Sequence, residues 1–235
     1  MSNIVKGYTD YYTRSTGGMY PTEWLIRTFK GRYPKLKFNA QELKGLDLLE
    51  MGFGEGRNMP LFDEIGLRLH GVEISQQICD IAATKLRRYG IQADLRVGFN
   101  HATSFPATTF DCVVACHSFY YVTPGTTFKD NIIEANRILK PGGWFIADLV
   151  DSECYLFNDA TQIDDGLYRC AKDPFGGIRD GALFQAFDSR DAIKDSFAPY
   201  FGAFSFGYQR NDFYGSQSNH HFLVCRKHQE HETPR

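Results

Sequence analysis

The feature that most constrains this chain is a short apolar stretch that runs into three closely spaced glycines, at residues 46–58 (LDLLEMGFGEGRN). Its leucines and Met51 are typical of a parallel strand that is buried on both faces. Gly52, Gly54 and Gly56 permit positive φ angles and let a ligand lie directly against the backbone. The free N–H groups of such a turn, with the start of the following helix, favour an anionic group. This pattern predicts a nucleotide site at the carboxyl end of a strand in an open α/β sheet.

A second strand, residues 67–73, ends in the acidic residue Glu73. An acid at this strand tip accepts hydrogen bonds from ribose hydroxyls. The glycine spacing differs from the dinucleotide fingerprint G-x-G-x-x-G, because Arg57 and the residues after it supply no further glycine. Alternatively, Glu73 is a surface acid near the start of the helix after Ser75, where negative charge is favourable. Next to the glycine turn, ribose binding is the favoured interpretation.

Length, charge and cysteine usage limit the classes of protein to consider. A chain of 235 residues fits one α/β domain with a full core. The formal net charge of −2 gives no electrostatic footprint for nucleic acid or an anionic membrane. No apolar run has the length of a membrane span, and residues 1–20 lack a signal-peptide core. The cysteines are scattered without a C-x-x-C pair, which suits a reduced cytoplasm. We therefore expect a soluble, cytoplasmic protein, and we expect it to be a monomer or a homodimer.

Strands alternate with helices between residues 45 and 150, which predicts a doubly wound α/β fold with a mostly parallel sheet. In addition to the two strands above, we expect helices near 21–29, 76–88, 128–139 and 190–200. Further strands are expected near 91–97, 110–115, 144–150, 204–210 and 221–226. Residues 151–187 are rich in Asp, Gly and aromatics with little periodicity, which indicates an insertion or lid.

These boundaries divide a single domain, residues 1–228, into four parts. We expect an N-terminal helical cap at 1–40, a cofactor-binding core at 41–150, a substrate lid at 151–187, a C-terminal helix and hairpin at 188–228, and a flexible tail at 229–235.

Four segments, in chain order, resemble the motifs of the class I S-adenosylmethionine-dependent methyltransferases. Residues 49–58 (LEMGFGEGRN) look like the first motif, and residues 71–75 (GVEIS) are similar to the ribose-binding motif. Residues 110–114 (FDCVV) resemble the fourth strand, and residues 134–143 (EANRILKPGG) the helix and turn before the fifth. The resemblance covers roughly residues 45–150. All four segments stand in register at the family's spacing, which makes chance an unlikely explanation.

The resemblance implies a Rossmann-like methyltransferase fold with a seven-stranded, mostly parallel sheet whose last strand is antiparallel. It also implies S-adenosylmethionine as cofactor and S-adenosylhomocysteine as product. Glu50 would orient the glycine turn or the methionine amino group, and Glu73 would bind both ribose hydroxyls. Ile74 would pack on adenine, and backbone near Cys116 would hold the methionine end. The implied cofactor-binding residues are Glu50, Gly52, Gly54, Gly56, Asn58, Glu73, Ile74 and Cys116.

One motif departs from the family pattern. Family members often carry an acid after the third strand that accepts the adenine amino group, whereas residues 98–102 here read GFNHA. The side-chain oxygen of Asn100 could accept that hydrogen bond instead. Alternatively, Asn100 and His101 simply form a polar turn.

Methyl transfer to a hydroxyl benefits from a general base, and His117 is the best candidate because it follows the fourth strand at the carboxyl edge. A structural histidine in a strand-end turn is the alternative. Tyr121 could line the pocket or pack under the next helix, and Asp148 could approach the substrate or be a solvated acid. His220 and His221 point to opposite faces of a strand, so the sequence favours no metal site, with Mg²⁺ bound by acids such as Asp148 and Asp151 as the alternative.

Aromatic residues in the leader and the lid complete the expected site. Tyr11 and Tyr12 could contact the cofactor carboxylate and sulfonium, or form an aromatic flap for stability alone. The aromatics and arginines of the lid suit a polar ring-bearing or phosphorylated substrate such as a sugar nucleotide. The expected substrate contacts are Tyr168, Arg179 and His220, with Arg179, which lies between Gly177 and Gly181, as the first choice for an anionic group. An ordinary loop would have a similar composition.

The sequence therefore predicts a methyltransferase that acts on a small polar acceptor, most simply a hydroxyl of a sugar or related metabolite in a biosynthetic pathway. The near-neutral charge argues against nucleic acid as acceptor. The alternatives are N-methylation of an amino sugar or peptide amine, a catalytically silent S-adenosylmethionine-binding protein, and nicotinamide oxidoreduction.

Overall fold

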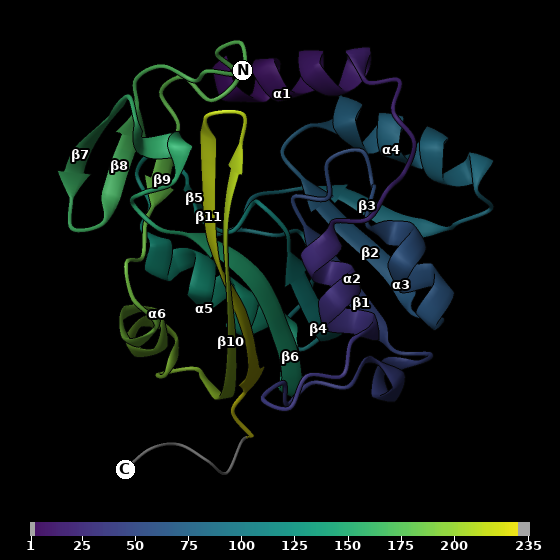
Figure 1. Ribbon diagram of the computed structural model, residues 1–235. Helices are drawn as coiled ribbons and strands as arrows, with labels where there is room; N and C mark the ends of the chain where they lie inside the picture. The colour runs from purple at the N-terminus through teal and green to yellow at the C-terminus, as the bar shows by residue number, and fades with distance from the viewer. Residues whose placement is uncertain (1–2, 230–235) are drawn as a thin grey trace.

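A seven-stranded sheet forms the centre of the computed structural model, which describes residues 3–229 (Figure 1). Its strands are β1 (Asp47–Met51), β2 (Arg68–Glu73), β3 (Ala93–Val97), β4 (Phe110–Ala115), β6 (Leu139–Val150), β10 (Phe201–Phe213) and β11 (Ser216–Lys227). The strand order is β10-β11-β6-β4-β1-β2-β3. The pairs from β6 to β3 are parallel, while β11 runs antiparallel to both β6 and β10. The predicted doubly wound sheet with an antiparallel last strand is confirmed.

Helices cover both faces of this sheet. One face carries α2 (Glu23–Lys30), α3 (Met59–Ile65) and α4 (Gln76–Arg88), and the other carries α5 (Phe128–Ile138) and α6 (Arg190–Phe197). Successive strand residues point to opposite faces of the sheet. Leu48 therefore packs in the core under α2, α3 and α4, and Leu49 in the core under α5 and α6. Burial on both faces explains the continuous apolar run of β1. In the described part of the chain, none of the helices has the length and apolar character needed to cross a membrane.

A second, four-stranded sheet lies above the main one, where the sequence predicted a lid. It consists of β5 (Tyr121–Val122), β9 (Leu183–Gln185), β8 (Leu167–Cys170) and β7 (Ala160–Asp164), paired antiparallel in that order. The helix α1 (Asn3–Arg14) lies across the same end of the molecule, and short 3-10 helices occupy Ala40–Leu43 and Tyr155–Phe157. The sequence analysis missed these strands because they are short and partly exposed, so they show no alternating pattern.

Some predicted boundaries need correction. Strand β6 begins at Leu139, immediately after α5, so the Lys-Pro-Gly-Gly segment belongs to the strand. The terminal hairpin strands extend well beyond the predicted 204–210 and 221–226, because they pair along almost their full length. The predicted flexible tail lies, from residue 230 onward, outside the described residues.

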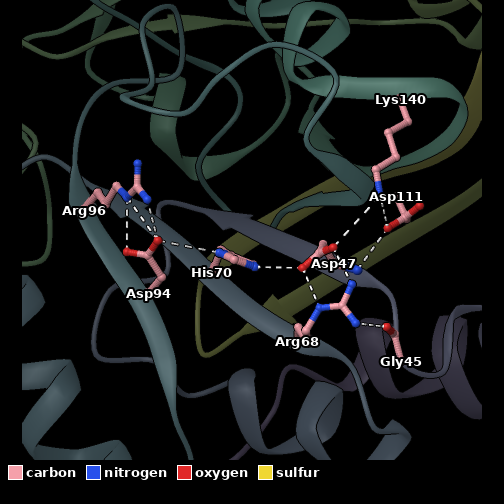
Figure 2. Close-up of polar contacts among 8 residues, drawn as sticks. All are labelled: Gly45, Asp47, Arg68, His70, Asp94, Arg96, Asp111 and Lys140. Atoms are coloured by element: carbon pink, nitrogen blue, oxygen red, sulfur yellow. Dashed lines mark hydrogen bonds and ion pairs between the residues drawn. The ribbon is translucent and has the colours of Figure 1, made fainter.

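The amino ends of the strands carry a network of paired charges (Figure 2). Asp47, the first residue of β1, accepts hydrogen bonds from Arg68 Nε at 2.9 Å and bonds to His70 Nε2 at 3.1 Å. Asp94 pairs with Arg96, and Lys140 bonds to Asp111 at 2.8 Å. At this edge the charged side chains are therefore paired with one another, either within a strand or between neighbouring strands.

Candidate active site

The opposite, carboxyl edge of the sheet holds a cavity of about 550 Å³. Its floor comes from the glycine turn after β1, the end of β2 and the segments after β3 and β4. Helix α1, β5 and the lid supply the remaining walls. The sequence-predicted residues that line it are Tyr11, Tyr12, Gly52, Asn58, Glu73, Ile74, Asn100, Cys116, His117, Tyr121, Arg179 and His220.

The glycine turn has the open backbone that the sequence predicted. Gly52 and Gly54 have φ angles of +68° and +58°, in the left-handed region that favours glycine. A Cβ atom on Gly52 would stand 2.5 Å from the Ser118 Cβ, and one on Gly54 would clash with the Tyr12 hydroxyl. Side chains at these positions would therefore obstruct the turn.

Glu73 ends β2 beside this turn and is 8 % exposed. Its Oε1 accepts a hydrogen bond from the Gly54 N–H at 3.1 Å, and its Oε2 accepts one from the Ile74 N–H at 2.6 Å. Burial raises the pKa of Glu73, although these two N–H groups oppose the shift. Each carboxylate oxygen keeps a second lone pair, which suits a pair of vicinal hydroxyls.

Glu50 lies beneath the turn and is fully buried, without lining the cavity. Its Oε1 accepts a hydrogen bond from Asn58 Nδ2 at 2.7 Å, and Asn58 Oδ1 accepts one from the Thr22 N–H at 2.9 Å. Its other oxygen has no partner among the described residues, and burial raises the pKa of Glu50 to about 8. This geometry supports the first of the two predicted roles, orientation of the glycine turn.

Asn100 lies where the family pattern would place an adenine-binding acid. Its Nδ2 donates to the Ser118 carbonyl at 2.7 Å, which leaves Oδ1 as an acceptor. Ser118 in turn donates from Oγ to the Met51 carbonyl at 2.6 Å. Phe99 and Ile74 line the same part of the cavity, so a flat ring could lie between apolar surfaces there.

A buried carboxylate, Asp148 near the end of β6, holds two histidines. Asp148 Oδ2 is 2.7 Å from Nδ1 of both His117 and His220, and its Oδ1 accepts the His117 backbone N–H at 2.6 Å. The His117 side chain is 42 % exposed and lines the cavity, whereas Asp148 is fully buried and does not. Asp148 therefore positions His117 and does not reach a substrate itself.

The same contacts set the charge of the pair. Burial alone would lower the pKa of His117, but the Asp148 carboxylate raises it well above its ordinary value. Burial would likewise raise the pKa of Asp148, yet the two imidazoles hold it below its ordinary value. With Nδ1 bound to Asp148, the ring nitrogen left for proton transfer is Nε2. His117 also has a φ of +55°, a strained angle that persists where the surroundings fix it.

Cys116 joins this cluster, because ligand atoms of Cys116, His117 and Asp148 lie within 4.8 Å of one another and could hold a metal ion. Nitrogen and oxygen ligands of a tetrahedral zinc ion lie roughly 3.3 Å apart, however. Asp148 is 2.7 Å from both imidazoles, which is a hydrogen-bond distance. We therefore interpret the cluster as a hydrogen-bonded one. The sequence analysis named these three residues singly and did not bring them together as one cluster.

Tyrosines and one arginine form the end of the cavity under the lid. The hydroxyl of Tyr8 contacts that of Tyr121, which joins α1 to β5. Arg179 Nη1 donates to the Tyr155 hydroxyl at 2.8 Å, and its Nε donates to Asp173 Oδ1 at 3.0 Å. Tyr168, which we expected to contact the substrate, does not line the cavity. Its ring packs against Phe157 inside the lid.

Sequence analysis also missed Tyr8, Tyr155 and Asp173. Tyr8 could have been found, since it stands one helical turn before Tyr12 and both rings face the cavity. Gly56 does not line the cavity and serves the turn itself.

Comparisons with known proteins agree with this geometry. Residues 49–147 match the family model described as a methyltransferase domain. An uncharacterised methyltransferase of Bacillus subtilis (strain 168), YdaC, is 30% identical over 105 residues, which cover 43% of this chain and 54% of that protein. The match thus spans about half the length of this relative.

Solved structures share the fold. A methyltransferase from Methanosarcina mazei, titled as S-adenosylmethionine-dependent, superposes with a TM-score of 0.66 at 19% identity and covers 85% of this chain and 99% of that one. The 1,6-didemethyltoxoflavin-N1-methyltransferase of Burkholderia thailandensis, solved with its acceptor and S-adenosylhomocysteine, has a TM-score of 0.62 at 17% identity, covering 97% and 86%.

Fold, glycine turn and strand-tip acid together define a nucleoside-binding α/β protein. Residues 49–147 match a methyltransferase domain, and the chain shares the fold of S-adenosylmethionine-dependent methyltransferases, whose cofactor is S-adenosylmethionine. Its residues fit this cofactor, because the bare backbone of Gly52 and the lone pairs of Glu73 face one cavity.

Proposed function

We propose that this protein transfers a methyl group from S-adenosylmethionine to a hydroxyl of a small polar acceptor, such as a sugar or related metabolite. The observation that carries the proposal is that His117, held by Asp148, lines the same cavity as the glycine turn and Glu73. A candidate base and a candidate cofactor site thus line one cavity, as methyl transfer to oxygen requires.

When bound, the cofactor would supply an electrophilic methyl group on a sulfonium. Glu73 would fix the ribose, Asn100 would accept from the adenine amino group, and Tyr12 would lie over the glycine turn. His117 Nε2 would take the proton of the attacking hydroxyl, while Asp148 keeps the ring oriented through Nδ1. Such a base typically contributes about 10²–10⁴-fold to the rate.

Two alternatives belong to the same cavity. The Burkholderia enzyme is titled as an N1-methyltransferase, which keeps N-methylation open for this fold. A silent cofactor-binding protein would be favoured by a lid that plugs the acceptor side. His117 lines the cavity together with Glu73 and the glycine turn, and this favours an enzyme.

The test is a screen of hydroxyl- and amine-bearing metabolites for release of S-adenosylhomocysteine, followed by mass spectrometry that locates the methyl group on oxygen or nitrogen. Calorimetry with S-adenosylmethionine and, separately, NADH would check the cofactor. We expect binding of S-adenosylmethionine alone and an O-methylated product. Cofactor binding without turnover on any acceptor would favour the silent binder, and an N-methylated product would replace the hydroxyl acceptor by an amine.

A further inference from the structure

The end of the cavity under the lid carries positive charge. Among the described residues that line the cavity, Glu73 is the only carboxylate, and it lies beside the glycine turn. Arg179 belongs to the lid and lies near Tyr8, whose ring stacks on that of Tyr12 beside the glycine turn. Its guanidinium group stays charged at any pH a protein experiences.

Arg179 has a counter-ion, but that counter-ion faces away from the cavity. Asp173 is fully buried and does not line the cavity. Its Oδ1 takes Arg179 Nε, and its Oδ2 accepts the Ile178 N–H at 3.1 Å, so both oxygens are engaged within the loop. Asp173 thus fixes one side of the guanidinium plane, while no bond from Nη2 is found among the described residues.

Neutral hydroxyl donors surround this guanidinium. Arg179 bonds to the Tyr155 hydroxyl, and Tyr8 and Tyr121 lie near enough to interact with its charge. Burial raises the pKa of Tyr8 to about 12 and that of Tyr121 well above its ordinary value. These phenols therefore keep their protons at neutral pH and can donate hydrogen bonds to an anion.

We propose that the methyl acceptor carries a carboxylate, which Arg179 binds together with the hydroxyls of Tyr121 and Tyr155. This inference rests on the proposed function, since it assigns the class of acceptor for that site. An acceptor with an ammonium group would be repelled by Arg179, because no carboxylate lines this end of the cavity among the described residues. A phosphate dianion would bring twice the negative charge of a carboxylate to a single guanidinium, whose Nε already donates to Asp173.

Matched probes test the proposal on protein saturated with S-adenosylhomocysteine. The pairs are glucuronate with glucuronamide, and 4-hydroxyphenylacetate with its amide, with glucose 6-phosphate as the phosphate probe. Affinity is measured by calorimetry and ligand-detected NMR. In wild-type protein we expect at least one acid to bind about ten- to hundredfold more tightly than its amide.

Three variants separate recognition from structure. Arg179→Gln should abolish the preference for the acid, and the double variant Arg179→Gln with Asp173→Asn should do the same without leaving an unpaired buried carboxylate. Arg169→Gln, an exposed arginine of the same lid, is the matched control and should keep the wild-type ratio. Affinity for S-adenosylhomocysteine should stay within about twofold in all three.

Several outcomes would overturn the inference. These are equal binding of acid and amide in wild-type protein, no binding of any acid, tighter binding of the phosphate, or equal weakening of acid and amide in both Arg179 variants. A large loss of S-adenosylhomocysteine affinity in Arg179→Gln would instead assign this residue to the cofactor's own carboxylate. Acid binding that depends on Arg179 but is never followed by methylation would support the carboxylate site at Arg179 and would overturn the proposed function, and with it the assignment of the bound acid as methyl acceptor.

Discussion

At the amino ends of its strands the sheet carries Asp47 and Asp94, whereas near the carboxyl ends it carries Glu50 and Glu73. The first two bond to Arg68 and Arg96, which hold their pKa values below the ordinary range (Figure 2). The second two are buried without a cation partner, and burial raises their pKa values. At one edge of the sheet Asp47 and Asp94 pair with cations of the chain, whereas at the other Glu50 and Glu73 are contacted only by neutral hydrogen-bond donors.

This contrast gives opposite pH dependences. A carboxylate with a lowered pKa contributes stability that is present above its unfolded pKa and is lost as pH falls through the folded one. A carboxylic acid with a raised pKa stabilises most at low pH, and its contribution is lost as pH rises toward the folded pKa. Asp47 and Asp94 belong to the first case, Glu50 and Glu73 to the second.

The largest effect is expected at the carboxyl edge, on turnover. Replacing His117 by Ala should lower kcat by about 10²–10⁴-fold if Nε2 is the base, because the attacking hydroxyl loses its proton acceptor. In wild-type protein kcat/KM should rise with pH through the raised pKa of His117, since only the neutral imidazole accepts a proton. Steady-state kinetics across pH 6–10 would measure both.

Asp148→Asn gives the matched comparison for His117. Without the carboxylate, the rise in kcat/KM should move to lower pH, and cofactor affinity should remain. Chelation with EDTA should leave turnover unchanged, in agreement with a hydrogen-bonded cluster. A flat pH profile shared by wild type and His117→Ala would remove His117 from the chemistry.

The second effect is on stability and comes from Glu50. Its pKa is raised by burial to about 8, so the free energy of unfolding should fall between about pH 5 and pH 8, by on the order of 3 kcal/mol. Glu50→Gln keeps the acceptor for Asn58 and mimics the protonated acid, so it should flatten this slope. Urea unfolding without cofactor, repeated at several pH values, would reveal it; an unchanged slope in Glu50→Gln would assign the pH dependence to another group.

The third effect concerns cofactor affinity. Glu73→Ala should weaken S-adenosylmethionine binding by about 1.5–3 kcal/mol, roughly ten- to hundredfold, because two ribose hydroxyls lose their acceptor. Asp94→Ala, at the amino end of the neighbouring strand, should bind the cofactor like wild type. If calorimetry finds the same affinity in the two variants, Glu73 does not bind the ribose, and the two edges do not differ in their role in cofactor binding.

The sequence predicted the sheet and the cofactor side of the cavity because those features are local. The apolar run of β1, the glycines after it and Glu73 at the end of β2 can each be interpreted within a few residues. The acceptor side combines segments far apart in the chain. Asp148 meets His220, 72 residues on, only because β11 pairs antiparallel with β6.

The lid shows the same limit. Tyr121 pairs with Phe184 as β5 joins β9, and the hydroxyl of Tyr8 meets Tyr121 across 113 residues. Neither contact leaves a periodic pattern in the sequence. Arg179 was predicted from its setting between glycines, but its buried partner Asp173 depends on the conformation of the loop between them.

The smallest effect is expected at the amino edge. Asp47→Asn should cost at most about 1 kcal/mol of unfolding free energy at neutral pH, because its partner Arg68 is 60% exposed and water screens the pair. The loss should begin to shrink as pH falls below about 4 and should disappear only below the lowered pKa of folded Asp47, where the wild-type carboxylate is also protonated. Urea unfolding at pH 7 and pH 3 measures both, and affinity for S-adenosylmethionine should not change. A loss of cofactor affinity as large as that of Glu73→Ala would mean that β1 transmits the state of one edge to the other, and the two edges would then have to be treated as one coupled system.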